Sequence, residues 1–231
     1  MPLSLRAVSL DLDNTLWDTP PVLLRAEAAL AAWLAEHAPA ITALFDSGRF
    51  RRLRAEIAGR EPGRAHDVTW LRTESLRHAA SLAGYPGTLA EQAFEVFWRE
   101  RNTLELYAEV DAALARLAAL VPVYALTNGN ASVQQVGIGR YFTGAIDAPT
   151  AGAAKPDREI YRRLVDLAAI PAGTILHVGD DALADVHGAR AAGLQAAWMN
   201  RTGAKWPDEL PLPDHEIADL NALADLVESR L

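Results

Sequence analysis

The chain has 231 residues, half of them hydrophobic, and its 22 basic and 30 acidic side chains give a formal net charge of −8 at pH 7. This length and hydrophobic content are sufficient for one or two globular domains with a substantial core. A net negative charge repels nucleic acid phosphates and anionic lipid headgroups, so we expect neither nucleic acid nor a membrane as a partner.

The sequence contains no cysteine, which excludes disulfides, thiolate zinc sites and cysteine nucleophiles. No signal peptide is predicted, because the apolar run near the N-terminus is short and ends in acids. The most apolar later segment, 114–126, is interrupted by Arg116 and Pro122, so it does not predict a membrane-spanning helix. We therefore expect a cytoplasmic protein, and no obligatory protein partner is evident.

Four short apolar runs have the composition of strands that are buried on both faces. These runs lie at 7–10, 121–126, 174–178 and 195–199. Apolar residues with helical spacing occur between and after them, at 114–121, 161–168 and 220–227. The alternation of strand and helix predicts an α/β fold with a Rossmann-like parallel sheet flanked by helices.

The stretch 17–102 has a different pattern, with few strand signals. Apolar residues there follow helical spacing, as at Ala26, Ala29, Leu30 and Trp33, and loops rich in glycine and proline separate the helical segments. We predict an all-helical domain at 17–102, inserted after the first strand of an α/β core that comprises 1–16 and 103–231.

Polar residues follow each of the four predicted strands, where parallel α/β sheets bind ligands. These residues are Asp11, Thr127, Asp180 and Asn200. Asp13 follows Asp11 by two positions, so in extended backbone both carboxylates point the same way. One carboxylate can attack phosphorus while the other protonates the leaving oxygen, provided that a cation offsets the negative charge. Taken alone, the same pair is also compatible with a solvated turn.

Four motifs in this order resemble those of the haloacid dehalogenase-like (HAD) hydrolases. They are DLDNTL at 11–16, LTN at 126–128, KP at 155–156, and GDD at 179–181 with Asp185. The resemblance covers the whole chain, because the helical insert occupies the position of the first-type cap domain of this family. It implies a phosphatase that forms an aspartyl-phosphate and uses Mg²⁺.

The resemblance implies a role for each matching residue. Asp11 would be the nucleophile, and Asp13 the general acid that later activates water. Thr127 and the Asn128 backbone would hold phosphate oxygens, and Lys155 would neutralise charge. Mg²⁺ would be held by Asp11, the Asp13 carbonyl and Asp180. Asp185 would orient Lys155 or the metal waters, or would cap a helix, and we favour a capping or supporting role for Asp181.

Further segments resemble bacterial phosphatases of flavin mononucleotide and of 5-amino-6-(5-phospho-D-ribitylamino)uracil, a riboflavin precursor. They lie at 21–25, 66–70, 127–131 and 175–181. Two of them fall in the predicted cap, where Trp17, Arg25, His66 and Trp70 are candidates for contacting a ring or ribityl chain. Trp70 is also a candidate for the cap core, and Arg25 for an ion pair with Glu27 or Glu74.

The expected substrate is therefore a small phosphorylated metabolite. Asp13 favours a phosphate ester over a carbon–halogen or phosphonate substrate, because relatives that cleave those bonds lack a carboxylate at this position. Two alternatives remain. One is a phosphatase for phosphoglycolate or sugar phosphates, and the other is a non-catalytic protein that binds phosphate ligands on the same fold.

Overall fold

The computed structural model describes residues 4–231, and these form two compact units. The core unit consists of the described residues up to Asp18 together with Glu105–Leu231, and the helical unit is Thr19–Leu104. The two junctions thus fall after residues 18 and 104, each two positions beyond the predicted junctions after residues 16 and 102.

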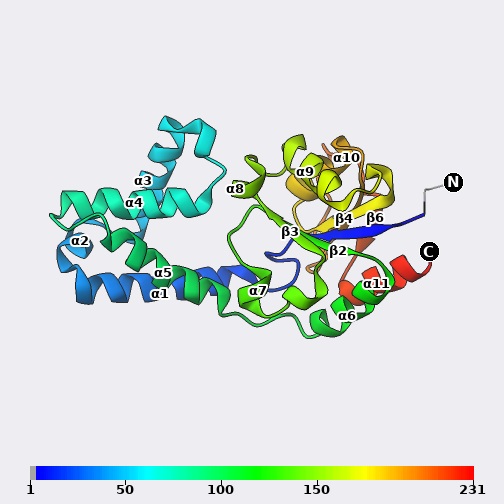
Figure 1. Cartoon of the computed structure of the whole chain (residues 1–231), viewed down its shortest axis with the longest axis horizontal. Coiled ribbons are helices and arrows are strands. Elements are labelled where there is room, and N and C mark those ends of the chain that lie inside the picture. The colour runs from blue at the N-terminus through cyan, green and yellow to red at the C-terminus, as the bar shows by residue number, and fades with distance from the viewer. Residues whose placement is uncertain (1–3) are drawn as a thin grey trace. The chain divides into compact units, whose positions relative to one another are not determined.

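The core unit is built on a six-stranded sheet in the order β3-β2-β1-β4-β5-β6, with every neighbouring pair parallel (Figure 1). The strands are β1 (Ala7–Leu10), β2 (Val123–Thr127), β3 (Gly144–Asp147), β4 (Ile175–Gly179), β5 (Gln195–Met199) and β6 (His215–Ile217). This arrangement confirms the predicted α/β fold with a Rossmann-like parallel sheet.

The four predicted strands are the central ones, and the edge strands β3 and β6 were not predicted. Every residue of β1, β2 and β4 is buried, which is why these strands are mostly apolar. The edge strands are short and only partly buried, so their sequences mix polar and apolar residues. The prediction for β2 began at residue 121, but the strand begins after Pro122, which has no N–H to donate to the sheet.

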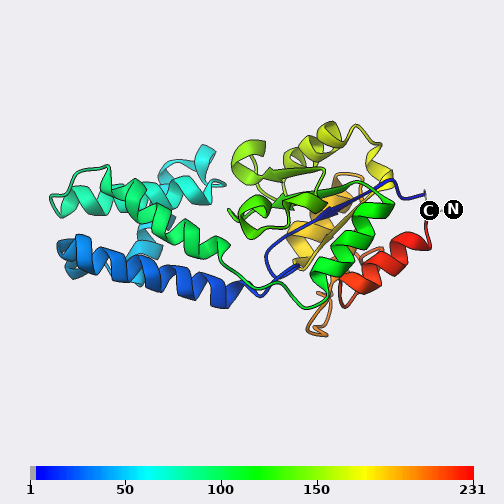
Figure 2. The same ribbon diagram turned by 60° about the horizontal axis from the view of Figure 1, so that its bottom comes forward.

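Helices cover both faces of this sheet. Figures 1 and 2 show α6 and α11 side by side on one face, and α9 with α10 on the other. The core helices are α6 (Val110–Leu120), α7 (Val133–Val136), α8 (Ala148–Ala151), α9 (Arg158–Ala168), α10 (Gly188–Ala191) and α11 (Leu220–Glu228). On the α9 side the apolar core includes Tyr124, Leu126, Tyr161 and Leu164. Because helices cover both faces, the carboxyl ends of the strands are where a ligand can reach the sheet.

The helical unit consists of α1 (Thr19–His37), α2 (Pro39–Leu44), α3 (Ser47–Arg60), α4 (Val68–Leu82) and α5 (Leu89–Asn102). Helix α5 packs against α1 and α4, and the helices share one apolar core. Asp46 and Asp67 cap α3 and α4 by accepting a hydrogen bond from a backbone N–H three residues ahead. Within residues 4–231, no helix combines the length and apolar character needed to cross a membrane.

Candidate active site

The carboxyl ends of β1, β2 and β4 surround a polar cavity of about 180 Å³ in the core unit. Its walls are formed by Asp11, Asp13, Asn14, Thr127, Asn128, Gly129, Lys155, Asp180, Asp181, Ala184 and Asp185. The structure thereby brings together the eight residues of the core that the sequence analysis assigned to the site. Asn200, expected at the same edge, and Trp17, predicted in the cap, do not line the cavity. Among the described residues that line this cavity, five carry carboxylates and only Lys155 carries a positive charge.

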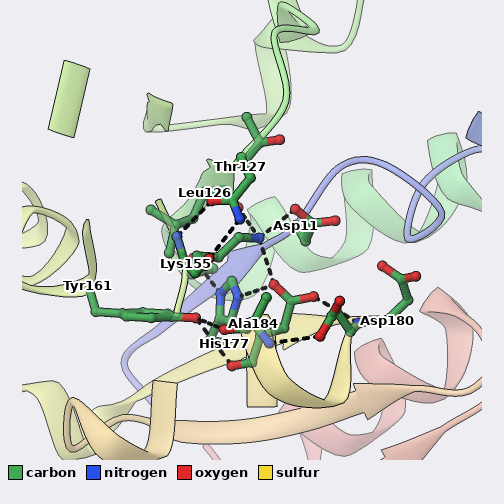
Figure 3. Close-up of polar contacts among 12 residues, drawn as sticks. Asp11, Leu126, Thr127, Lys155, Tyr161, His177, Asp180 and Ala184 are labelled. Atoms are coloured by element: carbon green, nitrogen blue, oxygen red, sulfur yellow. Dashed lines mark hydrogen bonds and ion pairs between the residues drawn. The ribbon is translucent and has the colours of Figure 1, made fainter. Parts of the chain in front are cut away.

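A buried ion triad forms the floor of this cavity (Figure 3). The Nζ of Lys155 lies 2.6 Å from Oδ1 of Asp11 and 2.6 Å from Oδ1 of Asp185, and it donates a third hydrogen bond to the carbonyl of Leu126 at 2.9 Å. All three side chains of the triad are buried. Because an ammonium has three N–H bonds, the hydrogen-bonding capacity of Lys155 is completely used.

Burial and charge act in opposition within the triad. Burial opposes the charged form of Lys155, but Asp11 and Asp185 outweigh it and raise the pKa of the lysine. Burial likewise opposes ionisation of Asp185, yet Lys155 and a hydrogen bond from His177 hold its pKa well below the usual range. For Asp11 burial prevails over the attraction of Lys155, so the pKa is raised. A second cation beside Asp11 would favour its ionised, nucleophilic form.

The Asn128 side chain fixes the backbone of Lys155. Its Oδ1 accepts from the Lys155 N–H at 2.7 Å, and its Nδ2 donates to the Lys155 carbonyl at 2.9 Å. Sequence analysis assigned only the Asn128 backbone a role, so this reciprocal pair was missed. The neighbouring Thr127 hydroxyl accepts from the Gly129 N–H at 2.9 Å, and it lines the cavity. The end of β2 thus positions both the lysine and the hydroxyl.

The carboxylates of Asp11, Asp180 and Asp185 can direct oxygens to within 4.8 Å of one another. Hard oxygen donors at this spacing suit Mg²⁺. Asp185 already accepts from Lys155, from His177 and from the Asp181 N–H, so Asp11 and Asp180 are better placed to bind an ion directly. Burial, followed by repulsion from Asp185, raises the pKa of Asp180 to about 6. The donor set therefore fits the predicted metal.

Two predicted polar positions have structural roles. The Asp181 carboxylate caps the π-helical turn Ala182–His187 by accepting from the N–H groups of Leu183 and Ala184, as the capping interpretation anticipated. Asn200, expected at the ligand-binding edge, does not line the cavity. Its amide instead bonds the Ala204 backbone and the Glu216 carboxylate, which fixes the loop after β5.

Trp17 has a different environment from the one predicted for a residue that contacts the substrate. It belongs to the core unit and is fully buried. Its indole Nε1–H donates to Oδ1 of Asp13 at 2.9 Å. The contact that the structure shows is therefore with the predicted general acid, and the indole holds that carboxylate in place.

Arg25 and His66 lie in the helical unit, outside the cluster of core residues. Arg25 is half exposed, donates to the Thr103 carbonyl and lies 3.6 Å from Glu100. The alternative pairing of Arg25 with Glu27 or Glu74 is wrong, because Glu27 pairs with Arg54 and Arg72, and Glu74 pairs with Arg77. His66 is partly buried in the turn before α4.

Trp70 packs against the helical core, as the alternative interpretation stated, and the guanidinium of Arg64 lies 4.2 Å from the centre of its ring. His177 and Ser9 are polar residues behind the triad that sequence analysis did not single out, and both are completely buried. Both lie within strands whose residues are all buried. The one signal in the sequence was a polar residue inside a run expected to be buried, because buried polar groups need hydrogen-bond partners.

Comparison with known proteins identifies the family. A family model described as haloacid dehalogenase-like hydrolase matches residues 5–193. The chain is 34% identical over 229 residues to 5-amino-6-(5-phospho-D-ribitylamino)uracil phosphatase YigB of Escherichia coli, covering 96% of this chain and 95% of the relative. It is 28% identical to phosphoserine phosphatase of Thermus thermophilus, covering 94% and 96% of the two chains.

A crystal structure of 2-haloacid dehalogenase from Pseudomonas syringae pv. Tomato superposes with a TM-score of 0.92 at 36% identity, covering 98% of this chain and 99% of that chain. The chain therefore belongs to the haloacid dehalogenase-like hydrolases, a family in which its relatives include both phosphatases and dehalogenases.

Gly179 is required by the position of Asp185. A Cβ at residue 179 would lie 2.2 Å from the Asp185 carboxyl carbon, far inside contact distance. We expect Gly179→Ala to lower the free energy of unfolding by about 1–3 kcal/mol or more, measured by urea unfolding. Gly59→Ala is the control, because a Cβ there in α3 meets nothing within 4 Å. Equal stabilities of the two variants would contradict the close packing.

Asp180 should destabilise the metal-free protein at pH 7. Folding raises its pKa from about 3.8 to about 6, so the folded state binds more protons between these values and the group's contribution to stability rises as pH falls through this window. Asp180→Asn should therefore raise the melting temperature of chelator-treated protein by a few degrees at pH 7, and by less near pH 4. It should also remove any rise in melting temperature that Mg²⁺ gives the unsubstituted protein. An unchanged magnesium response would exclude Asp180 as a ligand.

Proposed function

We propose that this protein is a Mg²⁺-dependent phosphate monoester hydrolase that acts through an aspartyl-phosphate on Asp11. The observation that carries the proposal is the placement of Asp13. Its carboxylate lines the same cavity as Asp11, Thr127 and Lys155, and Trp17 holds it there. A second carboxylate beside the nucleophile is what protonation of an alkoxide leaving group requires.

Each step of this reaction can be assigned to groups in the cavity. Lys155 holds Oδ1 of Asp11, which leaves Oδ2 to attack phosphorus. As the new O–P bond forms and the ester P–O bond breaks, Asp13 gives its proton to the departing oxygen. Asp13, now ionised, takes a proton from water as that water attacks the aspartyl-phosphate, which releases phosphate and regenerates both carboxyl groups.

The electrostatics of the cavity support the metal requirement. Five carboxylates against one lysine give the lining of the cavity an excess of negative charge, which repels a phosphate dianion. Bound to Asp11 and Asp180, Mg²⁺ would offset this charge and polarise the phosphoryl group. The Thr127 hydroxyl would then donate to a phosphoryl oxygen, and the charge of Lys155 would help to offset that of the phosphate.

The likeness to a 2-haloacid dehalogenase makes dehalogenation the alternative to exclude. Halide leaves as an anion and needs no proton, so a dehalogenase has no use for an acid at residue 13. A divalent cation site beside the nucleophile is also unnecessary for a substrate without phosphate. Asp13 and the Asp11–Asp180 pair therefore favour a phosphatase.

For the substrate, we propose a phosphate ester on a ribityl chain, either flavin mononucleotide or the ribitylaminouracil phosphate. Support comes from the 34% identity to YigB across nearly the full length of both chains, and from the segments in the helical unit that resemble the same subgroup. Phosphoserine phosphatase, a relative at 28% identity, favours a small polar ester as the second candidate, alongside phosphoglycolate and sugar phosphates. A non-catalytic binding role is disfavoured because both Asp11 and Asp13 are present.

Phosphate release should be measured across flavin mononucleotide, the ribitylaminouracil phosphate, phosphoserine, phosphoglycolate and sugar phosphates, and halide release from 2-chloropropionate. We expect preference for the two ribityl compounds, loss of activity with a chelator and its recovery with Mg²⁺. Asp11→Asn should reduce the rate to background, because the nucleophile is removed. Asp157→Asn, which alters a carboxylate that caps α9 outside the cavity, serves as the control.

Preference for another ester would overturn the substrate but retain the mechanism. Halide release from 2-chloropropionate without phosphate release would overturn the phosphatase assignment. Absence of activity on every compound, in protein shown to be folded, would support the binding protein.

Trp17→Phe should selectively impair leaving-group protonation, because phenylalanine keeps an aromatic ring but lacks the N–H that holds Asp13. We expect kcat/KM to fall about tenfold for an alkyl phosphate, a fraction of the effect of a complete general acid. For p-nitrophenyl phosphate, whose leaving group needs little protonation, kcat/KM should stay nearly constant. Trp206→Phe removes an indole N–H that bonds the Leu210 carbonyl and is the matched control. Equal losses on both esters would contradict this role.

A further inference from the structure

A chain of polar side chains extends from the ion triad into the interior of the sheet. His177 on β4 and Ser9 on β1 are register partners in neighbouring parallel strands, so their side chains point to the same face. Nδ1 of His177 lies 3.0 Å from Oγ of Ser9, and Nε2 lies 3.2 Å from Oδ1 of Asp185. Neither Ser9 nor His177 lines the cavity, and both are completely buried.

The hydrogen bonds fix which ring nitrogen of His177 carries the proton. Asp185 is an ionised acceptor, so the nitrogen that faces it, Nε2, must be the donor. Burial lowers the pKa of His177 and keeps the ring neutral, so Nδ1 is unprotonated and accepts from the Ser9 hydroxyl. The ring of Tyr161 packs edge-on against the imidazole, with 5.5 Å between centres. Figure 3 shows His177 beneath Lys155, with Tyr161 beside it.

Asp185 connects this chain to the reacting groups. Its Oδ1 accepts from both Lys155 and His177, and its Oδ2 accepts from the Asp181 N–H. Lys155 in turn spans Asp185 and the nucleophile Asp11 with N–O distances of 2.6 Å on each side. A displacement of the Asp185 carboxylate would therefore move the ammonium that holds Asp11.

The fold itself does not require a polar pair at these positions. The interior of a parallel sheet normally holds apolar side chains, and buried polar groups cost free energy unless they are fully hydrogen-bonded. Replacing both partners by apolar groups of similar shape is often neutral for stability. The packing of the strands therefore does not account for the hydrogen bond from His177 to Asp185. The need to hold Asp185 within the ion triad does.

We propose that His177, held by Ser9, is a positioning residue for phosphoryl transfer that fixes the Asp185 carboxylate and, through it, the Lys155 ammonium beside the nucleophile. This inference rests on the proposed phosphatase activity. His177 touches neither the substrate nor the reacting atoms. Its contribution is to keep Asp185 oriented while the charge on Asp11 changes during formation and hydrolysis of the aspartyl-phosphate.

The kinetic test compares three variants in full-length protein with Mg²⁺. His177→Leu removes the donor and should lower kcat by about 10- to 100-fold, the usual effect of losing a partner that orients a directly acting group. KM should change much less, since no substrate contact is lost. His177→Gln can donate an amide N–H from near the Nε2 position, so it should recover most of kcat. His215→Gln, on β6, is the matched control and should behave as the unsubstituted protein.

A double-mutant cycle separates positioning from packing. If His177 acts through Asp185, His177→Leu should change kcat by no more than about twofold in protein that already carries Asp185→Asn. The same cycle on melting temperatures of metal-free protein gives a readout that is independent of activity. There too, the effect of His177→Leu should shrink when Asp185→Asn is present.

The outcomes are distinguishable. Full activity of His177→Leu, or an equal loss of kcat in both backgrounds, would overturn the positioning role while leaving the phosphatase intact. Failure of His177→Gln to recover activity in folded protein would count against the hydrogen bond as the cause. Absence of phosphatase activity in the unsubstituted protein would instead refute the proposed function, and the melting-temperature cycle would still show whether His177 and Asp185 are coupled.

Discussion

The Lys155 ammonium, shared between Asp11 and Asp185, is the interaction on which the rest of the site depends. Removing these charges from water is costly, and the cost is offset only when every donor finds a partner. Lys155 meets this condition because the Leu126 carbonyl accepts its third N–H. The three acceptors come from β1, β2 and the turn after β4, so the parallel register of these strands is what assembles the triad.

The triad also explains the charge balance around it. One lysine divided between two carboxylates leaves a net negative centre, and Asp13, Asp180 and Asp181 add to it at the cavity wall. Burial, followed by repulsion from Asp185, raises the pKa of Asp180, so the excess of negative charge adds to the effect of burial there. This negative excess is the feature on which the proposed Mg²⁺ requirement rests. A cation bound there would offset the negative charge that otherwise repels a phosphate dianion.

Sequence analysis predicted which core residues lie together around the cavity, because their polar side chains follow strands that are parallel neighbours. Each central strand is an apolar run that ends in polar residues, and parallel strands bring these ends together. The side-chain partners of those residues were not predictable in the same way. The pairing of Asn128 with the Lys155 backbone depends on a loop conformation, and the contact of His177 with Asp185 depends on the π-helical turn that returns the chain across Gly179. Neither leaves a periodic signal.

The residue type of Trp17 did not predict its structural role. A tryptophan next to a catalytic motif suggests stacking on a flat ligand, but both its burial and its hydrogen bond are set by local backbone geometry. The isolated bridge between Asp13 and Trp17 brings the two residues together across a tight turn, in which Asn14 adopts a positive φ of 58°. Asparagine tolerates this conformation better than most residues. The residue type at position 14 is therefore compatible with the turn, but it did not predict the contact between Trp17 and Asp13.

The volume of the cavity is sufficient for the reacting phosphoryl group but not for a complete organic substrate. At about 180 Å³, with walls dominated by carboxylates, it can hold a phosphoryl group and an ion but falls below the roughly 300–1,000 Å³ typical of pockets that enclose a complete organic ligand. The residues that line the cavity therefore do not indicate whether the alcohol is a ribityl chain, serine or a sugar. In the proposed mechanism, Asp13, which accepts a hydrogen bond from Trp17, determines the type of bond that is cleaved, and selectivity for the alcohol would come from residues outside the cavity.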